Sequence, residues 1–178
     1  MSINPGRYEF GPQNGKMVVR VYREGMAKKA GHDLIIDVNS WKATADIAEN
    51  PAQSQFTASV DVGSFNVREG VGGVKPLSEG DKADIKKNIT QKILTSPEIS
   101  FTSTAVQPSG DSATITGDMR IMGRTNPATV KLSQDGNKVK GTLSIVQSQW
   151  GIKPFQAMMG ALKVKDQVDI ELEANIPS

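Results

Sequence analysis

The only histidine of the chain, His32, is the residue best suited to acid–base chemistry. Its imidazole could act as a general base or anchor the polar head of a ligand. The alternative is a histidine at the start of a strand whose ring bonds to the backbone. Asp33 cannot orient the ring, because neighbouring side chains of an extended segment point to opposite sides. No Gly-x-Ser-x-Gly motif supplies a nucleophile, so we predict no catalytic residue.

Residue types that bind metals or phosphates form no recognisable site. The chain lacks cysteine, and no group of carboxylates has the spacing of metal ligands. The glycine-rich run Gly70–Lys75 lacks the Gly-Lys-Ser/Thr ending of a phosphate loop, and no strand–helix–strand pattern surrounds it. We expect no metal and no cofactor, and we interpret this run as a flexible flap at the mouth of a barrel.

A methionine-rich segment, Trp150–Leu162, is the third candidate site. Phe155, Met158 and Met159 are apolar but follow neither a helical nor a strand period. Methionine adapts to irregular apolar surfaces, so the segment is predicted to line a ligand site. Two alternatives are a loop that folds back on the outside of the fold and a contact in a homodimer.

Alternating strands must position these candidates. The segment Ala113–Leu132 contains two of them, in which Ile115, Met119 and Val130 share a dry face. Their connection is predicted at residues 123–127, with Pro127 as the first residue of the second strand. Asn14-Gly15 and Asp135-Gly136-Asn137 predict two further hairpin turns. Other alternating strands are predicted at residues 8–10, 16–23, 34–38, 41–48, 55–65, 98–106, 138–149 and 166–176.

One amphipathic helix is predicted over residues 81–94. Asp81 can cap it, and Ile85, Ile89 and Ile93 recur every four residues as one apolar stripe. With 178 residues the chain is expected to form a single domain, residues 1–178. The predicted fold is all-β: an up-and-down antiparallel barrel of about eight strands with one helix. A two-sheet sandwich fits the strand count almost as well.

The residues on the dry faces predict what the barrel holds. Many are small, so the lumen would be left open, and bulkier apolar residues would line it. Small residues that pack against large ones across the barrel are the alternative. The small inward residues are Ala43, Ala45, Ala58, Ala105, Ala113, Gly117, Ala128, Gly141 and Ala174. The predicted ligand-binding residues are His32, Phe56, Val60, Phe101, Ile115, Met119, Phe155, Met158, Met159 and Ile170.

Composition excludes several partners. The formal net charge is only +2 and basic residues are scattered, which argues against nucleic acid. No segment approaches the ~20 apolar residues of a membrane span, so no stable membrane insertion is expected. The N-terminal residues do not have the pattern of a signal peptide, which predicts a cytoplasmic protein.

Five short motifs, in order along nearly the whole chain, resemble the YceI-like family. They are Gly31-His32-Asp33-Leu34; Pro76-Leu77 with the helix to Ile93-Leu94; Pro97–Ser103; Ile115–Asp118 with Asn126–Val130; and Gly151–Phe155 through Val168. The resemblance implies a lipocalin-like barrel that encloses a polyisoprenoid lipid. It also implies that the helix and the methionine-rich loop lie near one end of the barrel.

These observations predict a non-catalytic carrier or sequestering protein for a polyisoprenoid, an isoprenoid quinone or another long-chain lipid. One alternative is an isomerase or cyclase that acts on a lipid in the same barrel, with His32 as its base. The other is an oligomeric scaffold with a plugged lumen, which uses the apolar loop as its interface.

Overall fold

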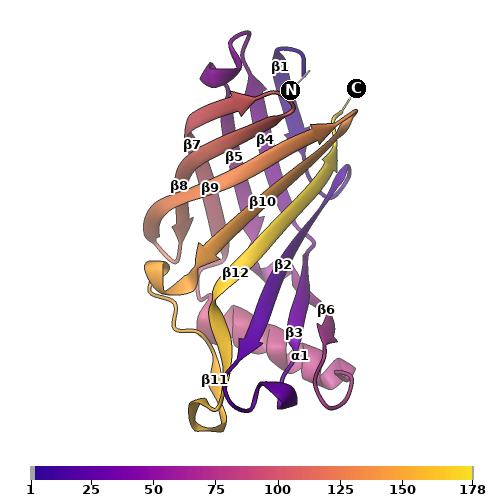
Figure 1. The fold of residues 1–178 in the computed structure, drawn as a ribbon, viewed down its shortest axis with the longest axis vertical. Coiled ribbons are helices and arrows are strands. Elements are labelled where there is room, and N and C mark those ends of the chain that lie inside the picture. Colours follow the sequence, from indigo (N-terminus) through magenta and orange to yellow (C-terminus); the bar gives the residue numbers. More distant parts are fainter. Residues whose placement is uncertain (1–2, 178) are drawn as a thin grey trace.

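The computed structural model describes residues 3–177, and strands dominate it (Figure 1). A 12-stranded antiparallel sheet curls into a half-barrel of the lipocalin type. The strands are β1 (Gly6–Phe10), β2 (Gly15–Glu24), β3 (Asp33–Val38), β4 (Trp41–Ile47), β5 (Gln55–Asp61), β6 (Phe65–Val71), β7 (Glu98–Ser109), β8 (Ser112–Ile121), β9 (Arg124–Asp135), β10 (Lys138–Val146), β11 (Gln156–Ala157) and β12 (Leu162–Asn175). The all-β prediction is confirmed, but the strand count exceeds the expected eight.

The higher count has a local cause. The predicted strand 55–65 is divided at Asp61, whose carboxylate accepts a hydrogen bond from the Gly63 backbone N–H at 2.8 Å. Residues Val62–Ser64 then form a 3-10 turn, and the chain changes partners: β5 pairs with β4 and β7, whereas β6 pairs with β3. The two-residue strand β11, which pairs with β12, raises the count further.

The sheet is mostly a meander. Its order is β1-β4-β5-β7-β8-β9-β10-β12-β2-β3-β6, so β1 and β6 are its two edges. The hairpin predicted at Asn14-Gly15 is wrong, because β1 pairs with β4 while β2 pairs with β12 and β3. The Asn14 side chain instead closes a local turn, accepting from the Gly11 N–H at 2.9 Å and donating to the Glu9 carbonyl at 3.1 Å.

The hairpin of β8 and β9 is confirmed, with a shorter turn than expected. Met122 and Gly123 both have positive φ (51° and 76°), so two residues make the whole connection, the length and handedness favoured in hairpins. Pro127 therefore lies inside β9, not at its start. It stands beyond the stretch of β9 that pairs with β10, so its missing N–H removes no hydrogen bond there.

The helix α1 (Glu79–Asn88) covers the lower part of the barrel beside β6 (Figure 1). It begins with a capping box: the Ser78 hydroxyl accepts from the Asp81 N–H, and the Asp81 carboxylate accepts from the Ser78 N–H. Ser78, not Asp81, is thus the N-cap. A π-helical turn, Ile89–Ile93, continues the helix.

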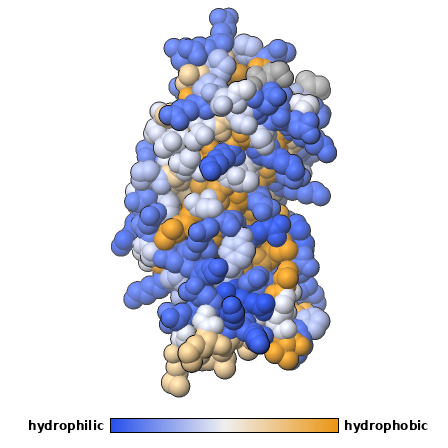
Figure 2. Space-filling model, in the orientation of Figure 1, coloured by the Kyte–Doolittle hydropathy of each residue, from blue (hydrophilic) through white to orange (hydrophobic). Residues whose placement is uncertain are grey.

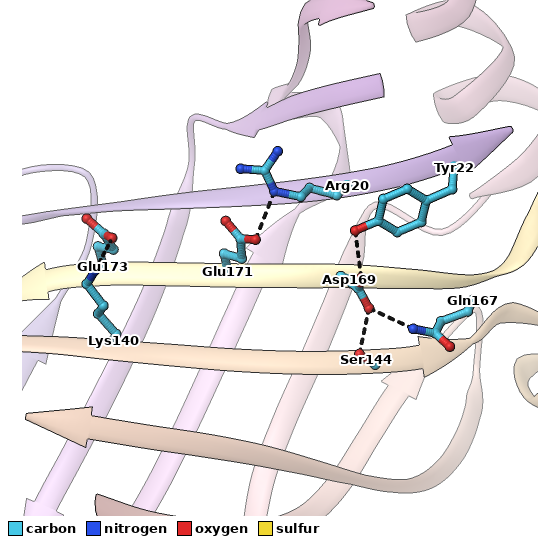
Figure 3. Close-up of polar contacts among 8 residues, drawn as sticks. All are labelled: Arg20, Tyr22, Lys140, Ser144, Gln167, Asp169, Glu171 and Glu173. Carbon is cyan, nitrogen blue, oxygen red and sulfur yellow. Dashed lines mark hydrogen bonds and ion pairs between the residues drawn. The ribbon is translucent and has the colours of Figure 1, made fainter. Parts of the chain in front are cut away.

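The outer face of β2, β10 and β12 carries a polar network (Figure 3). The Asp169 carboxylate accepts from the Ser144 hydroxyl at 2.5 Å and from the Tyr22 hydroxyl at 2.6 Å. These bonds, that of Ser144 first, hold the pKa of Asp169 below its ordinary value. Burial, helped by the bond to Asp169, raises the pKa of Tyr22 to about 12. Beside them, Arg20 Nε donates to Glu171 at 2.8 Å. The network ties three strands together across the sheet.

Candidate functional site

A cavity of about 720 Å³ lies inside the curled sheet. Its volume is within the ~300–1,000 Å³ of pockets that hold small molecules. On β2 it is lined by Met17, Val19, Val21 and Arg23, which alternate along the strand and span roughly 20 Å at ~3.4 Å per residue. The cavity is therefore elongated along the barrel, and its walls are mainly Val, Ile, Leu, Met and Phe side chains.

The structure brings together eight of the ten predicted ligand-binding residues. The residues that line the cavity are His32, Phe56, Val60, Phe101, Ile115, Met119, Phe155 and Ile170. Met158 and Met159 are not among them. Both lie on the exposed tip of the loop after β11, so lining of the cavity by these two is not what the structure shows, and contact with a ligand stays a prediction.

The small residues that were predicted to face inward have three different environments. Ala43, Ala58 and Gly141 lie on the cavity wall, as predicted. At Gly117 the packing alternative holds, because a Cβ there would be 2.5 Å from the Phe101 ring. Ala105 is exposed and points outward, since the pairing of β7 with β8 shifts register between Ser103 and Ala105. A β-bulge of this kind reverses the faces of the residues that follow it.

The helix and its π-helical turn form one wall of the cavity. Ile85, Ile89, Ile93 and Leu94 all line it. The isoleucine stripe that the sequence shows is thus turned inward, and the helix covers an opening that the sheet leaves beside the edge strand β6.

A tryptophan closes a second opening, where β9 and β10 diverge. These strands pair only from Lys131 to Asp135 and from Lys138 to Thr142. Trp150, in the 3-10 turn Gln147–Trp150 that follows β10, is 2% exposed, and its Nε1–H donates to the Met119 carbonyl at 3.0 Å. Sequence reasoning missed this role, because an isolated tryptophan in an irregular segment has no period that assigns its direction.

One end of the barrel is packed with side chains that leave a second, separate pocket of only about 70 Å³. At the start of β2, Gly15 stands opposite Ala174, and a Cβ at Gly15 would be 3.1 Å from the Trp41 ring. Trp41, Ala174, Phe10 and other buried apolar residues form a core cluster there. None of these three lines the cavity, so this end is closed by packed side chains.

The cavity opens at the other end, where β2 finishes. Val74 and Phe155 line it there and are also exposed to solvent. His32 Nε2 is 2.7 Å from the Lys75 carbonyl oxygen; because a carbonyl only accepts, this ring nitrogen carries the proton. The bond is the backbone contact considered for His32, and the same ring still lines the cavity.

The mouth is also the polar part of the wall. Arg23, Lys75, Asp81 and Lys163 line it together with His32. The Arg23 guanidinium donates to the Gly31 carbonyl and is 3.8 Å from the Asp33 carboxylate. Its nitrogens lie so close to Gly72, which has a φ of +80°, that a Cβ there would clash with them. The bond of His32 to Lys75 therefore fastens the glycine-rich run that was expected to be a flap, and Arg23 lies against this run at Gly72. The sequence analysis assigned none of these charged residues to the cavity, although Arg23 continues the alternation of Met17, Val19 and Val21 on β2.

Comparison with known proteins identifies the family. The model of the YceI-like domain matches residues 8–176. The chain belongs to the YceI-like family. UPF0312 proteins from three Pseudomonas aeruginosa strains are each 31% identical over 83 residues, which is 47% of this chain and 39% of the relative. The match thus spans well under half the length of these relatives.

Solved structures confirm the fold of this YceI-like chain. BcnA of Burkholderia cenocepacia superposes with a TM-score of 0.62 at 20% identity, over 90% of this chain and 96% of that one. The Campylobacter jejuni YCEI protein gives a TM-score of 0.52 at 13% identity, over 80% and 85%. At these identities the likeness establishes the lipocalin-like barrel alone.

No cluster that could hold a metal ion was found in the part of the chain that is described, residues 3–177. Within the same residues no helix is long and apolar enough to cross a bilayer.

Proposed function

We propose that this YceI-like protein binds a long-chain apolar lipid of the polyisoprenoid type in its barrel and carries or sequesters it without chemical change. The family is known as a polyisoprenoid-binding fold. The observation that carries the proposal is the shape and chemistry of the cavity: about 720 Å³, elongated, apolar, closed at one end and open at the other. Such a cavity suits a chain that enters by its tail.

The expected affinity follows from the apolar area that the lipid buries. Each buried methylene contributes about 0.8 kcal/mol, so ten give about 8 kcal/mol before the cost of ordering the chain. A micromolar dissociation constant is therefore the tightest that about ten buried methylenes allow, because the cost of ordering the chain has still to be subtracted. The polar residues at the mouth, Arg23, His32, Lys75 and Lys163, are placed to meet the head of a lipid whose tail fills the interior.

Binding without catalysis is part of the proposal. His32, the one imidazole, uses Nε2 to hold the Lys75 carbonyl. A lipid isomerase or cyclase would instead need this ring as its base. The enzyme hypothesis therefore predicts that the wild type turns over a lipid and that His32→Ala abolishes this turnover. A His32→Ala protein that still binds lipid, beside a wild type that leaves the lipid unchanged, supports the carrier.

Native mass spectrometry tests the proposal with two matched variants. Ala58 lines the cavity, and Ala105, which belongs to the neighbouring strand β7, points outward. We expect the wild type to retain an extractable lipid or to gain the mass of an added polyprenol. Ala58→Phe should lower binding at least about tenfold by occupying the cavity, whereas Ala105→Phe should not. Two results would overturn the proposal. One is a wild type that shows only the mass of the protein and gains none when polyprenol or fatty acids are added, and the other is equal binding of lipid by both variants.

A further inference from the structure

Three segments meet at the open end of the barrel, residues 25–32, 70–78 and 151–165. We call them the mouth loops, and they include the last residues of β6, the short strand β11 and the first residues of β12. The Ala27 N–H donates to the Ala161 carbonyl at 2.8 Å, which joins the first loop to the third. The bond between His32 and the Lys75 carbonyl joins the first to the second. The three loops therefore form one continuous surface around the cavity opening, at the lower end of the molecule in Figure 1.

The exposed apolar side chains of the molecule are concentrated on this surface. Seven large hydrophobic residues are exposed among residues 3–177, and only Val146 lies outside the mouth loops. The other six are Met26, Val71, Val74, Phe155, Met158 and Met159. Met26 and Met159 are 96% and 107% exposed. Figure 2 shows pale orange atoms at the lower tip of the molecule, over the loop after β11. Single exposed apolar residues are ordinary, but such a concentration marks an interaction surface.

The same loops carry positive charge and no acidic residue. They contain six lysines: Lys28, Lys29, Lys75, Lys153, Lys163 and Lys165. The chain as a whole is nearly balanced, with 21 basic and 19 acidic residues. Carboxylates flank these segments directly, at Glu24, Asp33, Glu69, Glu79 and Asp166. Three of them are bound locally, Asp33 by Arg23, Glu79 by Lys82 and Asp166 by Ser148. The mouth loops themselves thus combine protruding apolar tips with an excess of cations.

The backbone holds the two methionines after β11 in an unusual conformation. Met158 and Met159 have φ of 52° and 53°, and Gly160 follows with 86°. Side chains other than glycine and asparagine rarely occupy this left-handed region. Strained backbone at an exposed apolar tip is typical of a functional segment.

We propose that the mouth loops dock the protein on the surface of an anionic phospholipid bilayer. The methionine and phenylalanine side chains enter the boundary between head groups and acyl chains, and the lysines contact the lipid phosphates. A bilayer fits better than a protein partner, because Met26, Met158 and Met159 protrude and line no groove. The flexible lysines also suit mobile head groups. Docking does not require the cavity to carry lipid, but it would turn the cavity mouth toward the membrane.

Vesicle sedimentation tests the docking. We expect the purified protein to bind vesicles of phosphatidylcholine and phosphatidylglycerol in equal parts, and to bind pure phosphatidylcholine vesicles about tenfold more weakly. Binding should also weaken as salt is raised, because the lysines are exposed and screened.

Two sets of variants separate the apolar and the charged contributions. Met26→Ser/Met158→Ser/Met159→Ser should lose binding about tenfold through the apolar contacts. Lys28→Gln/Lys29→Gln should lose at least about tenfold and show a flatter salt dependence. The control variants, Lys131→Gln/Lys138→Gln and Val146→Ser, change the same kinds of residue outside the mouth loops and should bind like the wild type.

Several outcomes would overturn the docking proposal. They are a wild type that ignores the anionic vesicles, mouth-loop variants that bind as well as the controls, and light scattering in which the methionine variant abolishes self-association instead of vesicle binding. Both sets consist of exposed side chains and share only the loop 25–32, so the remaining set decides the question if the other fails to fold. Loss of vesicle binding with unchanged binding of polyprenol in the cavity separates this proposal from the proposed function.

Discussion

Two buried tryptophans differ in whether the indole N–H has a hydrogen-bond partner. Trp150 and Trp41 are 2% and 5% exposed. The Trp150 Nε1–H bonds to the Met119 carbonyl, whereas Trp41 Nε1 has no hydrogen-bond partner among the residues described. A buried donor without a partner costs free energy, and a buried acceptor that loses its partner does so too.

The first prediction compares these two residues. Trp150→Phe should lower the free energy of unfolding by about 2 kcal/mol, since it leaves the Met119 carbonyl unbonded and opens space between β9 and β10. Trp41→Phe should cost at least about 1 kcal/mol less, because it also removes an unpaired donor. Urea unfolding of both variants measures the difference, and equal losses would contradict the prediction.

His32 shows what residue types could and could not predict. The residue type predicted a polar anchor for a ligand or a base, with a ring bonded to the backbone at the start of a strand as the alternative. Its bond to the Lys75 carbonyl was one of the alternatives, but the partner was unknown because it lies 43 residues away. Arg23, Lys75 and Lys163 were not among the predicted site residues. The alternation of Met17, Val19 and Val21 could have placed Arg23 on the inner face, whereas Lys75 and Lys163 lie outside the predicted strands and have no period that assigns their direction.

At the scale of the strands, Asp169 links β12 to its two neighbours. It accepts hydrogen bonds from Ser144 on β10 and from Tyr22 on β2 (Figure 3). These bonds lower the pKa of Asp169, so the carboxylate stabilises the folded state at every pH above its unfolded pKa of ~3.9. The contribution is lost as the pH falls through the lower folded pKa.

The second prediction follows from the lowered pKa of Asp169 in the folded state. Asp169→Ala should lower the free energy of unfolding at neutral pH by about 1 to 2 kcal/mol, a charged hydrogen-bond contribution reduced by partial exposure. The gap to the wild type should be constant from pH 5 to about pH 8 and shrink below pH ~4. Glu171→Ala, which removes an exposed ion pair with Arg20, is the control and should cost less than ~1 kcal/mol. A gap that persists at pH ~2 would contradict the assignment.

Helices and strands whose apolar residues recur with a clear period were predicted well, but the pairing between strands was predicted less well. The alternation of β8, β9 and β12 and the isoleucine stripe of the helix correctly placed apolar residues on the inner side. The Asn14-Gly15 turn was assigned to the wrong pairing, because turn chemistry is local whereas β1 is drawn to β4 by burial of Phe10 in the end cluster. The β-bulge in β7 reversed the face of Ala105, and the residue types of Ser103–Ala105 do not predict a bulge.

At the scale of the whole molecule, the hollow interior is the feature that the sequence predicted best. Side chains too small to fill the barrel lie on the cavity wall at Ala43, Ala58 and Gly141. A filled lumen, which the scaffold alternative requires, is not what the structure shows. The shape of the interior could not be predicted, since it depends on two coverings, the helix at one opening and Trp150 at the other, that only tertiary packing brings into place.

The open end and the closed end give the molecule a polarity that matters for the proposed role. A lipid that enters through the mouth loops leaves its head near Arg23, His32 and Lys75. An anionic membrane surface at the same end would shorten the path of an apolar tail through water. The pathway that such a protein serves, and its expected cytoplasmic location, stay predictions.

The lipid in the cavity is tested most directly by methyl NMR of protein labelled at its isoleucines. Ten isoleucines line the cavity, among them Ile36, Ile115, Ile145 and Ile170, and four do not: Ile3, Ile35, Ile47 and Ile176. With a bound polyprenol we expect intermolecular nuclear Overhauser effects from the lipid tail to the cavity isoleucines and none to the other four. Contacts confined to the four outside the cavity, or none to any isoleucine under saturating lipid, would contradict a lipid held inside the barrel.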